Sequence, residues 1–111
     1  MSKKINKLED LASERAVLAG LCQFGLDAYL DIDYVTSDTF TDDVNQLIFD
    51  CVYKSISENT EVELSSILSV ANNLGVEEII NTKEEIGYIR SLFNMPVVKS
   101  NLGTYAAKIT K

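Results

Sequence analysis

The sequence predicts an all-α domain, a bundle of about six helices. Apolar residues recur at intervals of three and four over most of the chain, which is the spacing of a helix face that packs on a core. Residues that commonly begin and end helices stand between these segments. No stretch alternates apolar and polar residues with a bias towards β-branched side chains, so strands are not expected.

Length and composition fit one domain. The chain has 111 residues, 46% of them apolar and only one of them proline, which is enough for a single core and argues against disorder. The first residues lack helical periodicity. We therefore expect a flexible N-terminal arm over residues 1–12 and the helical domain over residues 13–111.

The first helix is predicted to begin near Ser13, a plausible N-cap, with Glu14 in its first turn. Gly25 stands where a left-handed residue would end it. A second, short helix should cover residues 26–31. We expect three of its side chains to face the core: Leu26, Tyr29 and Leu30.

Residues 33–40 read as a connection whose last residue, Phe40, fills the core. Thr41 is the predicted N-cap of the third helix, and Asp42 and Asp43 lie where the helix dipole favours anions. This helix is the clearest element in the sequence, because its apolar residues form one continuous stripe. The stripe consists of Val44, Leu47, Ile48, Cys51, Val52 and Ile56.

Three further helices are predicted in the second half. Residues 57–61 form a polar loop, and the fourth helix then ends at Gly75, with one helical turn over residues 76–80. Residues 82–85 form a capping-box pattern that opens the fifth helix, which Pro96 interrupts. The last helix carries Val98, Leu102, Tyr105, Ala106 and Ile109.

The charge argues against nucleic-acid binding. The chain has 17 Asp and Glu against 10 Lys and Arg, a net charge of −7, and its only clusters of basic residues lie near the two ends. A domain with this charge would repel phosphate, so we expect no direct contact with nucleic acid. No segment resembles a signal peptide or a membrane span, and we expect a cytoplasmic protein.

Catalytic motifs are not found. The chain has no His, and no Gly is followed by Lys, so it has no triad, no phosphate-binding loop and no means of hydrolysing ATP. Cys22 and Cys51 fall on apolar stripes and are predicted to be buried free thiols. We expect no catalytic residue, no cofactor and no metal in this domain.

Two acidic patterns have structural explanations. The segment that starts at Asp31 fails as a calcium loop, because Thr36 stands where glycine is needed and Asp42 where a bidentate Glu is needed. The acidic pairs 42–43 and 84–85 each lie at a predicted helix N-terminus, where capping accounts for them.

The aromatic residues mostly fall on the apolar stripes and are predicted to pack in the core. Four residues are placed less firmly and are candidates for a protein–protein interface, where Tyr and Met are enriched. They are Tyr29, Tyr34, Tyr88 and Met95.

Several short segments carry a family resemblance through their order and spacing. They are Ser13–Leu21 (SERAVLAGL), Ser37–Phe40 (SDTF), Asn45–Phe49 (NQLIF), Gly87–Leu92 (GYIRSL) and Asn101–Ile109 (NLGTYAAKI). From about Ser13 to Ile109 the chain resembles the N-terminal domain of DnaB-type hexameric replicative helicases. It departs from the family pattern at Gly20, at residues 45–46 and at residues 86–87, which favours a phage or divergent member.

The resemblance implies a compact orthogonal bundle with a scaffold role in DNA replication. Such domains form a collar above the motor ring, support the hexamer and help to dock the primase or the helicase loader. ATP and Mg²⁺ belong to the motor domain, which lies outside this chain. Self-association, as a dimer or as the collar of a hexamer, is expected.

A second function stays open. A free-standing acidic helical protein could sequester a basic partner through its surface charge. A small enzyme that uses only carboxylates is a third reading.

Overall fold

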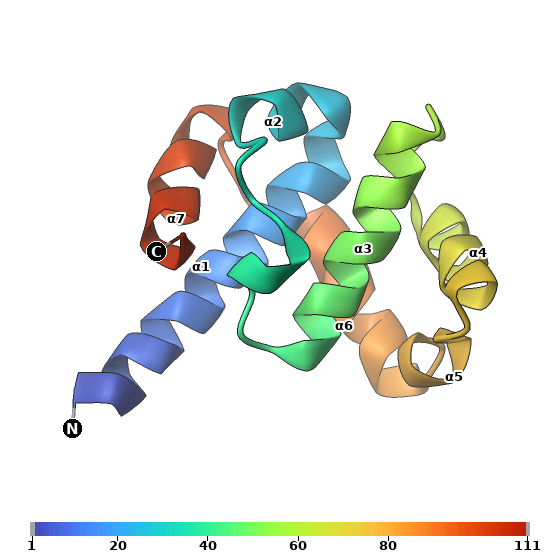
Figure 1. Ribbon diagram of the computed structural model, residues 1–111, viewed down its shortest axis with the longest axis horizontal. Helices are drawn as coiled ribbons and strands as arrows, with labels where there is room; N and C mark the ends of the chain where they lie inside the picture. The colour runs from blue at the N-terminus through green and yellow to red at the C-terminus, as the bar shows by residue number, and fades with distance from the viewer. Residues whose placement is uncertain (1, 111) are drawn as a thin grey trace.

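The computed structural model describes the backbone of residues 2–110 and the side chains of residues 11–110. This part of the chain contains seven α-helices, two 3-10 helices and no strand, which confirms the all-α prediction (Figure 1). Its radius of gyration, 13.1 Å, is that of a compact domain. The helices are α1 (Ser2–Phe24), α2 (Leu26–Asp31), η1 (Ser37–Thr39), α3 (Asp43–Ser57), α4 (Leu64–Leu74), α5 (Glu77–Ile80), α6 (Lys83–Asn94), η2 (Lys99–Asn101) and α7 (Leu102–Ile109).

The second half of α1 is the central helix of the bundle. It packs against α7, α6, α3 and α2 (Figure 1). Three consecutive residues, Val17, Leu18 and Ala19, are fully buried, since neighbours cover this part of the helix on several sides. The core therefore forms around α1, and α4 and α5 lie on the far side of α3.

The predicted start of the first helix is wrong. The helix begins at Ser2, and Ser13 is a buried residue inside it, not an N-cap. The side chain of Ser13 faces the core one position before a buried carboxylate, Glu14, which sequence periodicity alone reads as a first-turn residue. The flexible arm over residues 1–12 stays a prediction, because Met1 and the side chains of residues 2–10 lie outside the described part.

Gly20 permits a close approach between α1 and α7. A Cβ placed on Gly20 would lie only 2.6 Å from Cδ1 of Leu102, and Leu102 is fully buried. The absence of a side chain on α1 therefore makes room for the leucine of α7.

Gly25 joins α1 to α2 with φ of 58° and ψ of −130°. The positive φ agrees with the predicted need for glycine, although the ψ value lies outside the left-handed helical region. The inward orientation of Leu26 and Leu30 is wrong, because these side chains are 50% and 61% exposed. Ala28 is the buried residue of α2, and a rotation of 100° per residue directs both leucines away from it.

The stripe on α3 packs on the core as predicted, with Ile48, Cys51, Val52 and Ile56 buried and Val44 and Leu47 partly buried, and Phe40 lies in the core at 1% exposure. Asp42, not Thr41, is the N-cap: its side chain accepts a hydrogen bond from the backbone N–H of Asn45 at 3.0 Å. Thr41 instead binds a carboxylate on α1.

The remaining helix ends largely follow the sequence. Gly75 is left-handed (φ of 78°) and ends α4, and Thr82 accepts a hydrogen bond from the N–H of Glu85 at the start of α6. Asn59, with φ of 58°, turns the chain out of α3. Val98 is 59% exposed and precedes the last helix, so its predicted place within that helix is wrong.

Candidate protein-interaction surface

A buried carboxylate ties three segments of the bundle together. Glu14 on α1 is fully buried. Its Oε2 accepts hydrogen bonds from the backbone N–H and the hydroxyl of Thr41, at 2.8 and 2.7 Å, and its Oε1 accepts one from the Asn45 amide at 2.9 Å. The carboxylate thus lies at the N-terminus of α3, where the helix dipole favours a negative charge.

The same cluster reaches α6 through Tyr88. The Tyr88 hydroxyl donates a 2.6 Å hydrogen bond to Oδ1 of Asn45, and the Arg15 guanidinium lies 5.7 Å from the centre of the tyrosine ring. Burial raises the pKa of Tyr88 to about 12, although the nearby Arg15 opposes this shift. Every described buried polar side-chain atom has a hydrogen-bond partner, so this cluster is a structural joint with no unsatisfied group aimed at a ligand.

The four candidate interface residues do not form one site. Tyr88 belongs to the buried cluster, and Met95 is the half-buried C-cap of α6, whose carbonyl accepts a hydrogen bond from Gln23. Tyr29 and Tyr34 lie on and just after α2, and each lines a different shallow hollow. The role of these four residues at an interface stays a prediction.

Exposed apolar side chains gather around α2. Leu26, Leu30 and Tyr34 are about half exposed, and Tyr53 on α3 is 42% exposed. Tyr29 connects the two helices, because its ring lies 5.5 Å from that of Tyr53 in an edge-to-face arrangement. Sequence reasoning named Tyr29 and Tyr34 of this surface as interface candidates but missed Leu26 and Leu30, because it assigned these leucines to the core.

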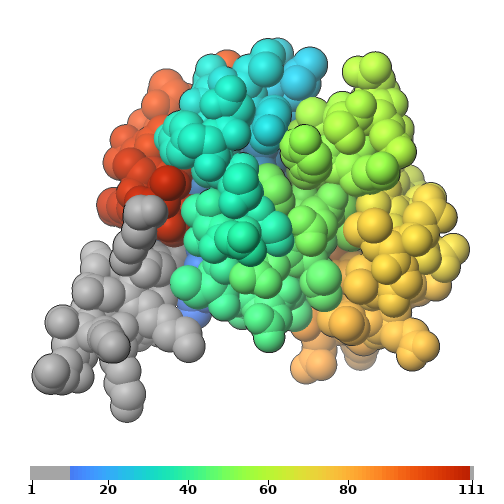
Figure 2. All heavy atoms as spheres, in the orientation of Figure 1, coloured from blue at the N-terminus to red at the C-terminus, as the bar shows by residue number. Residues whose placement is uncertain are grey.

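A groove opens beside Leu26. It has a volume of about 820 Å³ and lies between the end of α1 and the end of α3, with the loop after α3 along one side. Figure 2 shows the hollow between the cyan atoms of α2 and the yellow-green atoms at the end of α3. Its apolar lining comes from Cys22, Phe24, Leu26, Ile56, Val62 and Phe93.

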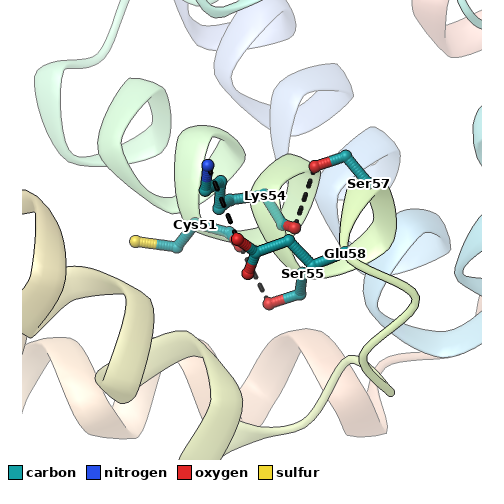
Figure 3. Close-up of polar contacts among 5 residues, drawn as sticks. All are labelled: Cys51, Lys54, Ser55, Ser57 and Glu58. Atoms are coloured by element: carbon teal, nitrogen blue, oxygen red, sulfur yellow. Dashed lines mark hydrogen bonds and ion pairs between the residues drawn. The ribbon is translucent and has the colours of Figure 1, made fainter.

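At the end of α3 beside this groove, side chains of the helix bond to its own backbone and to one another (Figure 3). The hydroxyls of Ser55 and Ser57 donate 3.0 Å hydrogen bonds to the carbonyls of Cys51 and Lys54. The Lys54 ammonium lies 3.5 Å from the carboxylate of Glu58. The positive charge of the Lys54 side chain is therefore already paired with a carboxylate.

The two cysteine thiols are not exposed on this surface. Cys22 and Cys51 are free and buried, as predicted, and burial raises their pKa values to about 12 and about 11. Over residues 11–110, no three His, Cys, Asp or Glu side chains group as a metal site would require. No helix in the described part has the length and apolar character needed to cross a bilayer.

Fold and surface together define a class: a small all-α domain whose distinctive features are a central buried helix and an apolar face left uncovered. The family model described as "DnaB-like helicase N terminal domain" matches residues 6–111. The chain therefore belongs to the family of DnaB-like helicase N-terminal domains, which confirms the resemblance seen in the sequence. Neither a curated protein nor a solved structure matches it.

Membership supports a scaffold role at the N-terminus of a helicase, with DNA replication as its setting. The matched domain is the non-catalytic part of such an enzyme. In the family, the parent protein assembles as a hexamer.

Proposed function

We propose that this domain supports assembly of a replicative helicase ring and docks a second replication protein, the primase or the helicase loader. ATP and Mg²⁺ bind in the motor of the ATP-dependent helicase, and this domain contributes contacts only. The cytoplasm is its proposed place of action.

The observation that carries this proposal is the family match over residues 6–111, nearly the whole chain. The exposed apolar side chains around α2 support it, because a small domain rarely leaves large apolar side chains clustered on its surface without a partner. Leu30, at 61% exposure, is the most exposed large apolar residue among those described.

Two measurements test the proposal. Sedimentation velocity across a wide concentration range reports self-association of the domain, and calorimetric titration with the primase and with the loader of the same replication system reports docking. We expect a concentration-dependent dimer or a saturable complex with one of these proteins. A strict monomer that binds neither protein would contradict the proposal.

The net charge of −7 favours one other function. A free-standing acidic protein of this fold could sequester a basic partner from outside the replication machinery, since opposite charge speeds and strengthens association. Saturable binding to such a partner, together with no binding to the primase or the loader, would select this second function.

A further inference from the structure

We infer that the uncovered face of α2 and the adjacent groove bind a cationic amphipathic helix of a partner protein. The inference rests on the proposed docking function and deepens it, because it names the surface and the chemistry of its occupant. We call this surface the α2 ridge: Leu26, Tyr29 and Leu30 on α2, with Tyr53 on α3 and the groove that Leu26 borders.

The apolar part of the ridge follows from helix geometry. Leu26 and Leu30 are one turn apart and share a face of α2, opposite the buried Ala28. Tyr29 lies beside this face, where its contact with Tyr53 extends the apolar surface onto α3. Two leucines one turn apart, next to a groove, suit the interlocking side chains of a second helix.

The charge around the ridge is negative. Asp27 is exposed on α2 next to the leucines, and Asp50 lines a hollow that Tyr29 and Tyr53 also line, whereas Asp31 is paired with Lys99. Glu61 lines the large groove. A helix that lays an apolar stripe on the leucines would therefore place its flanking side chains beside carboxylates.

Helix ends add to this negative charge. The groove is lined by residues from the last turns of α1 and α6 and from the end of α3, at Phe24, Phe93 and Ile56. A helix C-terminus carries a partial negative charge, and neither α1 nor α6 has a basic residue in its last turn to compensate for it. The two uncompensated ends, those of α1 and α6, favour a Lys or Arg side chain from a partner at this groove.

The basic residues of this region are already paired. Lys54 lies 3.5 Å from Glu58 and Lys99 lies 3.2 Å from Asp31. A second copy of the chain is a poorer occupant than a basic helix, because its own ridge carries the same acids and would meet them with like charge. Charge complementarity thus selects a cationic partner.

The test uses a synthetic peptide probe. A fluorescent amphipathic peptide of about 18 residues, long enough to form a helix, carries Leu at helical spacing on one face and Lys on the other. Its counterpart carries Glu in place of Lys. We expect the 111-residue protein to bind the Lys peptide at least about tenfold more tightly than the Glu peptide, with binding that weakens as salt screens the charges.

Matched surface variants place the binding site. Leu30→Asp on the ridge and Ile79→Asp on α5 each add one charge at an apolar side chain that is about half exposed, so both proteins should fold. We expect Leu30→Asp to weaken binding of the Lys peptide by about tenfold or more, the effect of losing a central contact, and Ile79→Asp to change it by less than about twofold. Equal losses in the two variants, or none in Leu30→Asp, would overturn the inference.

Amide chemical shifts on addition of the Lys peptide give a second readout. Changes that gather at residues 24–31 and 53–62 support the ridge, and changes centred on α4 and α5 overturn it. Light scattering addresses the other occupant: a dimer of the unmodified protein that Leu30→Asp makes monomeric would show that a second copy covers the ridge, which also overturns the inference. If the primase or the loader binds the unmodified protein and Leu30→Asp equally well, only the inference fails, whereas binding to neither protein is a failure of the proposed function.

Discussion

The amide of Asn45 donates a 2.9 Å hydrogen bond to the buried carboxylate of Glu14, joining α3 to α1 across 31 residues of sequence. The same asparagine accepts a hydrogen bond from Tyr88 on α6. Three helices that are separate in the sequence therefore meet at one polar pair in the core. The stability of the bundle should depend on this pair more than the few polar atoms involved would suggest.

Glu14→Ala should lower the free energy of unfolding by about 2–4 kcal/mol, because it leaves the buried amide of Asn45 without an acceptor and removes the acceptor of the Thr41 N–H. Urea denaturation measures this loss. Glu78→Ala, at an exposed position on α5, is the matched control and should change stability by less than about 0.5 kcal/mol. Similar values for the two variants would show that the Glu14 hydrogen bonds contribute little.

Gly20→Ala should destabilise the protein by about 1–3 kcal/mol, because the new Cβ would overlap the side chain of Leu102. Gly103→Ala is the matched control on α7. Nothing lies within 4 Å of a Cβ there, so alanine should stabilise the helix by up to about 1 kcal/mol. Thermal unfolding distinguishes the two variants, and an unchanged melting temperature for Gly20→Ala would mean that α7 can shift away without cost.

Gln23→Ala should cost about 1–3 kcal/mol, since the Gln23 amide donates to the carbonyls of Leu92 and Met95 at 2.9 and 2.7 Å. These bonds hold the end of α6 against α1. Asn94→Ala, which removes one exposed bond to Arg90 within α6, should change the unfolding free energy much less. Hydrogen exchange at the end of α6 should rise in the Gln23 variant alone, and unchanged exchange there would contradict the assignment.

Stability should fall as pH rises above about 9. The pKa of Cys22 is raised from 9.0 to about 12 and that of Cys51 from 9.0 to about 11, while Tyr88 rises from 10.0 to about 12. The folded state holds these protons when the unfolded state has lost them, so the unfolding free energy decreases with pH between about 9 and 12. Denaturant midpoints across this range measure the decrease.

Cys22→Ala serves as the control for that pH dependence, because it removes the thiol whose pKa shifts most. The variant should be less stable at neutral pH, owing to lost packing, but its stability should fall less steeply above pH 9. A thiol reagent should also modify Cys22 and Cys51 only in denaturant, since both side chains are buried and protonated. Rapid modification of the folded protein near neutral pH would contradict this.

Much of the architecture was predictable because it is local. The stripe on α3, the left-handed Gly75 and the N-cap at Thr82 depend on side chains within a few residues of one another, and all three are confirmed. The family could also be predicted, because the order and spacing of the segments that carry the resemblance can be recognised in the sequence without knowing their contacts.

Glu14 shows where periodicity misleads. It lies four residues before Leu18 and seven before Leu21, on the same stripe of α1, so an acid at an apolar position was the available signal of a buried, partnered carboxylate. Its partners, Thr41 and Asn45, are about thirty residues away. No local rule connects residues at that distance.

The amino-acid sequence alone determined the helical class, most helix boundaries, the family and the acidic charge, because spacing, capping and composition act over one or two turns. Tertiary packing decided which face of α2 is covered. Two leucines in a six-residue helix can face either way, and only the burial of Ala28 against its neighbours directs Leu26 and Leu30 towards solvent. The surface available for docking is therefore a property of how the helices pack.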